Sequence, residues 1–195
     1  MSEEQGRAKY VCPYDGVSFT SFQDLKDHVV TQHADLEAPK PEGLLNLIIN
    51  GRKHVLTVEP NWTLNYLIHD KLGLHSVKMF CDRGACGSCT VIINGRPILS
   101  CMILAIECDG AVIETAEGIH AAGHPLIESY VKHHAMQCGY CTPGFVTTAK
   151  ALLDRNPDPT VEEIVDAISG NLCRCGTYPQ HPKAISEAAA KQQRR

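Results

Sequence analysis

The chain has 195 residues, of which 44% are hydrophobic and 21% charged, and its formal net charge is −4. This composition is typical of a globular protein, and no apolar run approaches the ~20 residues that a membrane-spanning helix needs. The polar start MSEEQGRAKY lacks the apolar region of a secretory signal. We therefore expect a cytoplasmic protein, and the small negative charge gives no reason to expect nucleic acid as a partner.

Ten cysteines are the unusual feature of this composition. Disulfide frameworks are typical of small secreted domains that lack a full hydrophobic core. This chain instead shows strong helix and strand patterns and no export signal. Cysteines in such a chain are more often metal ligands than disulfide partners.

The first segment, residues 1–37, contains an isolated group of metal-ligating side chains. Four of them follow the spacing of a zinc finger with two cysteines and two histidines, except that an aspartate stands at the second cysteine position: Cys12, Asp15, His28 and His33. Phe19 and Leu25 match the small core of a ββα finger whose helix begins near Ser21. Zinc accepts carboxylate oxygen, and so short a segment rarely folds without a metal or a cross-link. The pattern predicts a finger-like extension that binds zinc, with a degenerate, metal-free finger as the alternative.

The helix of this extension is a poor match to a DNA-reading helix. Its surface carries Gln23, Asp24, Lys26 and Asp27, with no arginine to contact guanine and little positive charge for phosphates. Docking onto a neighbouring subunit is the better interpretation.

A proline-containing linker, residues 38–43, separates the extension from a region of strand patterns, residues 44–118. Strands are expected at 44–49, 53–58, 90–93, 96–99 and 111–114. Two Asn-Gly pairs, at positions 50–51 and 94–95, are strong signals for tight hairpins. Between the hairpins Thr63 is expected to cap a helix that Gly73 ends. These short elements predict a compact α+β domain.

The pattern becomes helical after Gly118, which predicts an all-α four-helix bundle over residues 119–195. Pro125 and Pro143 suit first-turn positions, and Thr142 is expected to cap the second of these helices. Thr160 and Glu163 form a capping box at the third. A stripe of Ala184, Ile185, Ala188 and Ala189 marks the last helix.

The first cysteine set has the spacing C-x4-C-x2-C-x11-C and consists of Cys81, Cys86, Cys89 and Cys101. Its loop spacing is the plant-type ferredoxin pattern for a [2Fe–2S] cluster. Gly84 and Gly87 allow the loop to fold tightly around the sulfurs, so that backbone N–H groups face the anionic cluster. Zinc is the alternative metal, although it usually takes two similar cysteine pairs.

The second set has the spacing C-x2-C-x31-C-x-C and consists of Cys138, Cys141, Cys173 and Cys175. Each of its pairs precedes an expected helix start, where free N–H groups and partial positive charge favour thiolates. The two pairs would form a four-thiolate cage inside the helical domain. Structural zinc stays open as an alternative, since it accepts four cysteines.

Three motifs make residues 44 to about 188 resemble the small iron–sulfur subunits of the xanthine oxidase family of molybdenum hydroxylases, such as carbon monoxide dehydrogenase and the bacterial aldehyde and N-heterocycle dehydrogenases. They are CDRGACGSCTV together with Cys101, then QCGYCTPGF, then GNLCRCGTY. The resemblance implies a plant-type ferredoxin-like (β-grasp) domain followed by the helical domain, with a [2Fe–2S] cluster in each. Phe80 is a departure, because the family usually has glycine before the first ligand, and it should alter the packing there without removing a ligand.

The resemblance also implies partners. Molybdenum-pterin would lie on a large subunit and FAD on a medium subunit, in a heterotrimer or its dimer, with the helical-domain cluster nearer molybdenum and the ferredoxin-like cluster nearer the flavin. The family's pterin-contacting glutamine and last cysteine map to Gln137 and Cys175. The chain would then be the electron-transfer subunit of a molybdenum-dependent oxidoreductase, with the substrate site on another subunit.

Two other functions stay open from the sequence. A free-standing ferredoxin-type carrier would use the same cysteines, and a zinc-dependent regulator would use all of them structurally. Cys108 matches neither ligand set, and we expect a buried bystander.

Overall fold

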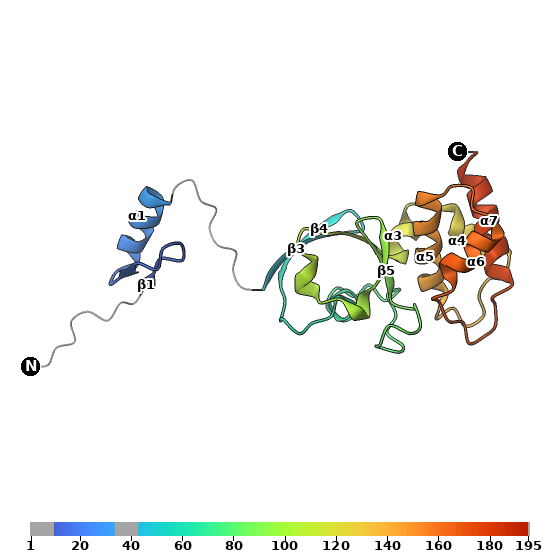
Figure 1. Cartoon of the computed structure of the whole chain (residues 1–195), viewed down its shortest axis with the longest axis horizontal. Helices are drawn as coiled ribbons and strands as arrows, with labels where there is room; N and C mark the ends of the chain where they lie inside the picture. Colours follow the sequence, from blue (N-terminus) through green and yellow to red (C-terminus); the bar gives the residue numbers. More distant parts are fainter. Residues whose placement is uncertain (1–9, 34–42, 195) are drawn as a thin grey trace, which may run out of the picture. The chain divides into compact units, whose positions relative to one another are not determined.

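The computed structural model describes residues 10–33 and 43–194. Two compact units divide the chain, Met1–Glu42 and Gly43–Arg195. Most of the expected linker, residues 38–42, lies outside the described residues, as do 1–9 and 34–37 of the expected extension. Figure 1 shows the elements of each unit along the chain.

The N-terminal unit is a short hairpin followed by a helix, as the finger spacing predicts. Strands β1 (Tyr10–Val11) and β2 (Ser18–Phe19) pair antiparallel, and helix α1 spans Phe22–Gln32. Ser21 caps the helix, because its side chain accepts a hydrogen bond from the backbone N–H of Gln23 at 3.1 Å. Helix α1 contributes no fully buried residue, so apolar burial alone supports this unit weakly.

The second unit begins with a five-stranded sheet in the order β4-β3-β7-β5-β6. Its strands are β3 (Leu44–Ile49), β4 (Arg52–Thr57), β5 (Thr90–Ile93), β6 (Arg96–Leu99) and β7 (Val112–Glu114). Both Asn-Gly turns have positive φ at both residues, 50° and 76° in the first and 49° and 79° in the second. This geometry is that of the type I′ turn, whose twist matches the flanking strands.

The helix expected after Thr63 is present, but only its first turn is α-helical. The hydroxyl of Thr63 accepts the N–H of Tyr66, and α2 (Leu64–Tyr66) passes directly into a π-helical turn, η1 (Leu67–Lys71). The wider turn is closed by the N–H of Leu72 bonding the carbonyl of Leu67 at 3.0 Å. It buries Leu67 and Ile68 in the core beneath the sheet. Two 3₁₀ turns, η2 (Ser100–Met102) and η3 (Ala105–Cys108), follow β6.

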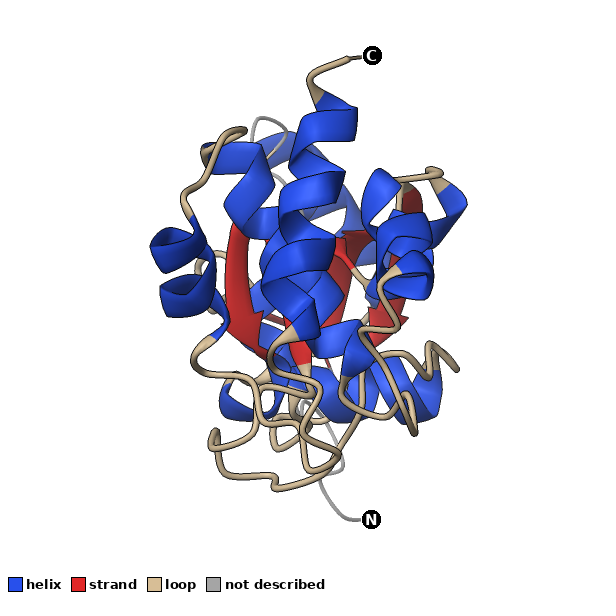
Figure 2. Cartoon of the chain, turned by 90° about the vertical axis from the view of Figure 1, so that its right-hand side faces the viewer, coloured by secondary structure: helices blue, strands red, loops and turns tan. Residues whose placement is uncertain are grey.

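Five helices follow the sheet: α3 (Ala116–Ala121), α4 (Pro125–Lys132), α5 (Thr142–Arg155), α6 (Val161–Ile168) and α7 (Gln180–Gln192). The last four are the expected ones, and they share one core that includes Tyr130, Phe145 and Ile185. Seen from their side of the molecule, the helices stand in front of the strands (Figure 2). The α+β class with a β-grasp part and a helical part is confirmed.

The expected helix starts are mostly correct. The capping box of Thr160 and Glu163 is present in both directions. The expected cap at Thr142 is wrong, because Cys141 occupies the cap position and Thr142 is the first helical residue. The hydroxyl of Thr142 is buried without a hydrogen-bond partner. Helix α3 begins two residues before Gly118, and the division of this unit at residues 118 and 119 stays a prediction.

The β-grasp part and the helical part meet backbone to backbone. Helix α5 packs against β5, and Figure 1 shows these two elements side by side. A Cβ atom added to Gly144 would collide with the carbonyl oxygen of Gly87 and lie 3.1 Å from the Cα of Ser88. Only glycine permits this approach.

We expect Gly144→Ala to destabilise the protein by about 1–2 kcal/mol. Overpacking typically costs about 1–3 kcal/mol, and the cost here falls at about 2–3 kcal/mol because the added Cβ would meet backbone atoms. Alanine's better helix propensity returns about 1 kcal/mol. The unfolding midpoint of the cluster-loaded protein in urea measures the change. Gly170→Ala is the matched control, because its added Cβ would meet no atom within 4 Å. Equal midpoints for both variants would contradict this account of the interface.

Candidate metal centres

The structure brings the four cysteines of the ferredoxin-like loop together. The sulfurs of Cys89 and Cys101 lie 3.4 Å apart, and the thiol of Cys86 interacts with that of Cys81 and helps to lower its pKa. Cys86, Cys89 and Cys101 are buried, while Cys81 is partly exposed. The four sulfurs thus form two close pairs.

The loop backbone is arranged to stabilise an anionic sulfur. The N–H of Ala85 donates to the sulfur of Cys81 at 3.3 Å. The pKa of Cys81 is lowered to about 7, mainly by the backbone N–H of Arg83. The backbone N–H groups of Ala85 and Cys86 add to this effect. Burial instead raises the pKa of Cys89 to about 12. A positive metal centre is the natural partner that would allow such a buried thiol to ionise.

The helical part assembles the second set at the start of α5 and in the loop that precedes α7. Cys141 caps α5, and Cys173 and Cys175 lie in the loop before α7. The thiol of Cys138 contacts that of Cys175, and the thiol of Cys141 contacts that of Cys173. Cys138 and Cys175 are exposed, whereas Cys173 is buried.

The second set also combines exposed and buried sulfurs. The backbone N–H of Tyr140 is the main cause that lowers the pKa of Cys138, and burial is the main cause that raises the pKa of Cys141 to about 12. A mostly apolar hollow of about 670 Å³ is lined by all four cysteines of this set together with Phe80, Tyr140, Leu172 and Tyr178.

In both sets the four thiols are therefore arranged as two pairs. A [2Fe–2S] cluster takes two thiolates on each of its two irons, and the paired sulfurs fit that division. The residues present fit the group that the spacing predicts. Bound there, such a cluster accepts and releases single electrons.

The two cysteine loops are joined by direct hydrogen bonds. The N–H of Leu172 donates to the carbonyl of Cys86 at 2.9 Å, and the side-chain amide of Asn171 donates to the carbonyl of Gly87 at 3.0 Å. Leu172 immediately precedes Cys173. Asn171 was not singled out from the sequence, and only its position in the GNLCRC motif before the third ligand could have drawn attention to it.

The N-terminal unit holds a third group, formed by Cys12, Asp15, His28 and His33. One ligand atom from each lies within 4.8 Å of all the others. The Oδ2 atom of Asp15 lies 3.1 Å from Nε2 of His28 and 3.2 Å from Nε2 of His33. Cys12 is 1% exposed. The structure therefore shows a candidate metal site at the residues that the finger spacing predicts.

Asp15 is held in place from its other side. Its Oδ1 atom accepts the N–H of Val17 at 3.0 Å, and this bond is the main cause that lowers the pKa of Asp15 to about 2. The carboxylate is thus ionised at neutral pH, and its other oxygen, Oδ2, faces the two histidines. Phe19 and Tyr14 flank those imidazoles, with ring centroids 4.9 Å from His28 and His33 respectively.

The other singled-out residues occupy different surroundings. Cys108 is buried, and burial raises the pKa of its thiol to about 11. Gln137 is exposed beside Cys138. Phe80 is 70% exposed and packs edge-on to Tyr140, whose hydroxyl donates to the carbonyl of Met79 at 2.8 Å. The departure at Phe80 thus creates an aromatic contact with the helical part.

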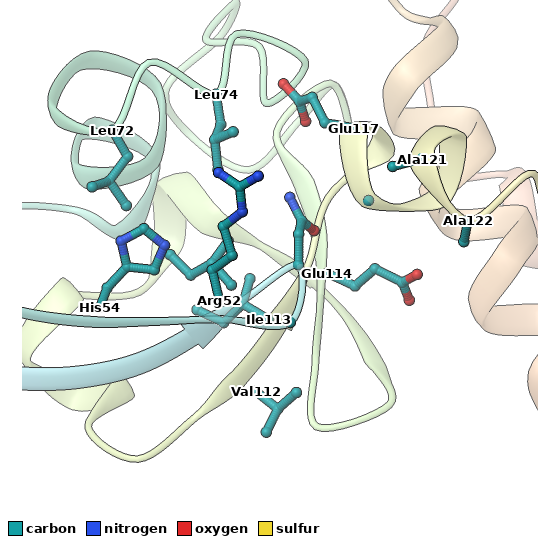
Figure 3. Close-up of a pocket in the computed structure, with 14 residues that line it drawn as sticks. Arg52, His54, Leu72, Leu74, Val112, Ile113, Glu114, Glu117, Ala121 and Ala122 are labelled. Atoms are coloured by element: carbon teal, nitrogen blue, oxygen red, sulfur yellow. The ribbon is translucent and has the colours of Figure 1, made fainter.

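A cavity of about 700 Å³ lies away from the sulfurs, because no cysteine lines it. In Figure 3, Arg52, His54, Leu72 and Leu74 lie on one side of it and Glu114, Ala121 and Ala122 on the other. It offers no metal-ligand set like those above. Across the described ranges, none of the helices combines the length and the apolar character needed to cross a membrane.

Comparison with known proteins identifies both cysteine-bearing parts. A model described as a 2Fe-2S iron-sulfur cluster binding domain matches residues 47–114, and one described as a [2Fe-2S] binding domain matches residues 115–186. The nicotinate dehydrogenase small FeS subunit of Eubacterium barkeri is 48% identical over 149 residues, covering 75% of this chain and 95% of that subunit. The aldehyde oxidoreductase iron-sulfur-binding subunit PaoA of Escherichia coli is 36% identical over 187 residues, covering 84% of this chain and 82% of that subunit. Among solved structures, quinoline 2-oxidoreductase from Pseudomonas putida 86 superposes with a TM-score of 0.74 at 40% identity, covering 77% of this chain and 95% of that one.

We expect Cys108→Ala to retain the full iron content and to lose about 1 kcal/mol of stability, because a buried thiol is replaced by a smaller side chain. Cys101→Ala is the matched comparison, and it should lose about half of the iron. Iron per chain, measured by elemental analysis, checks both. Loss of iron from Cys108→Ala would show that the ligand sets are assigned wrongly.

Proposed function

The chain belongs to the small [2Fe–2S] subunits of the molybdenum hydroxylases, and on that basis we propose which of its side chains hold the clusters and in what order electrons cross them. It is the electron-transfer subunit of a molybdenum-dependent oxidoreductase and has two [2Fe–2S]-binding domains. The proposed ligands are Cys81, Cys86, Cys89 and Cys101 for one cluster and Cys138, Cys141, Cys173 and Cys175 for the other.

The observation that carries this proposal is the pair of hydrogen bonds from Asn171 and Leu172 to the Gly87 and Cys86 carbonyls. These bonds hold the segment just before Cys173, a proposed ligand of the helical set, against the loop at Cys86, a proposed ligand of the ferredoxin-like set. Electron tunnelling weakens steeply with distance, so a relay needs such a fixed, close approach. Electrons from molybdenum would enter at the helical set and leave from the ferredoxin-like set.

The proposed partners are a large subunit with the molybdenum-pterin cofactor and a medium subunit with FAD, in a heterotrimer or its dimer. Exposure of Gln137, Cys138 and Cys175 supports the first of these, because the helical set reaches the surface where a pterin on another chain could meet it. We propose Gln137 and Cys175 as the pterin-facing residues. We propose the cytoplasm as the compartment, because a reducing environment keeps cysteine thiols available as metal ligands.

Purification of the tagged chain from its native source tests this function. We expect molybdenum, flavin and iron to co-purify with it, and the isolated complex to show two distinct [2Fe–2S] signals by electron paramagnetic resonance (EPR). Isolation of a lone, iron-containing chain would instead support a free-standing carrier. A colourless chain without iron would contradict both the proposed subunit function and the free-standing carrier.

We further propose zinc as the ion held by Cys12, Asp15, His28 and His33. Zinc prefers four ligands from sulfur, imidazole nitrogen and carboxylate oxygen, and this group supplies one sulfur, one oxygen and two nitrogens within 4.8 Å of one another. The weak core of the N-terminal unit supports the proposal, because a metal would supply the cross-link that apolar burial does not.

Zinc content per chain tests this assignment. The full chain should carry one zinc in addition to its iron, and the double variant His28→Ala/His33→Ala should lose the zinc and keep the iron. Zinc X-ray absorption should report one sulfur and three nitrogen or oxygen donors, free of interference from iron. The double variant His54→Ala/His120→Ala is the matched control, since both of its histidines lie in the other unit. Equal zinc in both double variants would mean that the zinc binds elsewhere.

A further inference from the structure

A short hydrogen-bonded chain leads from a ligand of the helical set into the protein core. The sulfur of Cys173 lies 3.1 Å from the hydroxyl of Thr177, which lies 3.2 Å from Nε2 of His181. His181 is fully buried in α7, and its ring stacks on Phe145 with centroids 3.9 Å apart and an interplanar angle of 9°. Neither Thr177 nor His181 has a role in the function proposed above.

The imidazole is neutral and therefore carries a single N–H. Burial lowers the pKa of His181 to about 4. Nδ1 is buried with no hydrogen-bond partner, so Nε2 is the nitrogen that bonds Thr177. A buried N–H without a partner is rarer than a buried acceptor without one. The proton therefore belongs on Nε2, which donates to the hydroxyl oxygen of Thr177.

The direction of the next bond follows from the chemistry of the ligand. A thiolate that binds iron carries no proton and can only accept. With its oxygen occupied by the N–H of His181, the hydroxyl of Thr177 directs its own proton at the sulfur of Cys173. The backbone N–H groups of Thr177 and Cys175 also donate to this sulfur, and the thiol of Cys141 interacts with it. Cys141 is itself a proposed ligand, so among the described residues the hydroxyl of Thr177 is the side-chain donor that a substitution can remove without removing a ligand.

We infer that Thr177 and His181 act as a directed pair that tunes the reduction potential of the helical-domain cluster, with Thr177 bonding the ligand sulfur and His181 orienting Thr177. This inference rests on the proposed ligand role of Cys173. Reduction adds negative charge to a cluster and its sulfurs, and a hydrogen bond to a ligand sulfur stabilises that charge. The pair therefore raises the potential of this cluster, which makes it a better acceptor of electrons from molybdenum. Both are positioning residues.

EPR-monitored redox titration of the complex tests the inference. Thr177→Val, which keeps the shape and removes the donor, should shift the potential of the helical-domain cluster to a lower value and leave that of the ferredoxin-like cluster unchanged. Thr177→Ser should restore the wild-type potential. Thr147→Val is the matched control, because the buried hydroxyl of Thr147 bonds the carbonyl of Pro143 instead of a sulfur; neither potential should move.

The role of His181 has its own signature. His181→Leu should lower the same potential, and His181→Gln, whose side-chain amide can still donate to Thr177, should move it less. The double variant Thr177→Val/His181→Leu should shift no further than Thr177→Val alone, because His181 acts through Thr177. Additive shifts would overturn the directed pair.

The remaining outcomes are decisive as well. Unchanged potentials in Thr177→Val, or equal shifts of both clusters, would overturn the inference while the proposed function stands. If Thr177→Val fails to load the helical-domain cluster, the same titration is made on His181→Leu. An unchanged potential of that cluster in His181→Leu would then overturn the inference. Absence of a second [2Fe–2S] signal from the wild-type complex would instead refute the proposed ligand sets.

Discussion

The close approach of backbone at Gly87, Gly144 and Asn171 is the constraint on which the arrangement of both cysteine sets depends. A side chain on Gly144 would collide with the ferredoxin-like loop at Gly87, and a side chain on Gly87 would collide with Gly170 and Asn171. The loop also accepts hydrogen bonds from Asn171 and Leu172, next to Cys173. Glycine at positions 87 and 144 allows this close approach, in which Leu172 bonds the loop through its main chain and Asn171 through its side-chain amide. The β-grasp part and the helical part are thus held in the relation that a relay between two clusters needs.

The two sets differ in how they meet their surroundings. In the ferredoxin-like set three of the four cysteines are buried, and the loop backbone donates to the sulfur of the partly exposed one, Cys81. In the helical set Cys138 and Cys175 reach the surface, while Cys173 points inward to Thr177. This asymmetry suits a subunit whose helical set receives electrons from a cofactor on another chain. It also gives the buried ligand a side-chain donor that can adjust the potential.

The N-terminal unit depends on different physics. Its helix buries no residue completely, whereas Cys12, Asp15, His28 and His33 bring one ligand atom each within 4.8 Å of the others. With aspartate in place of a second cysteine, the group would neutralise a divalent ion with one thiolate and one carboxylate. A single thiolate also cannot form an internal disulfide, which distinguishes this group from a finger with two cysteines.

The sequence by itself determined the elements that depend on near neighbours. Asn-Gly pairs specified both hairpins, Thr160 and Glu163 specified a helix start, and cysteine spacing grouped the eight proposed ligands and the finger residues. These signals are local, because turn geometry and helix caps involve residues only a few positions apart. Tertiary structure alone decided that Cys141, and not Thr142, caps α5, that the helix after Thr63 widens into a π-turn, and that Asn171 bonds Gly87. It also decided that Thr177 joins Cys173 to His181. Asn171 and Gly87 are 84 positions apart, and residue spacing along the chain does not show which distant groups packing will bring together. Cys173, Thr177 and His181 are only four residues apart in turn, but which of their side chains meet depends on how the loop and α7 pack into the core.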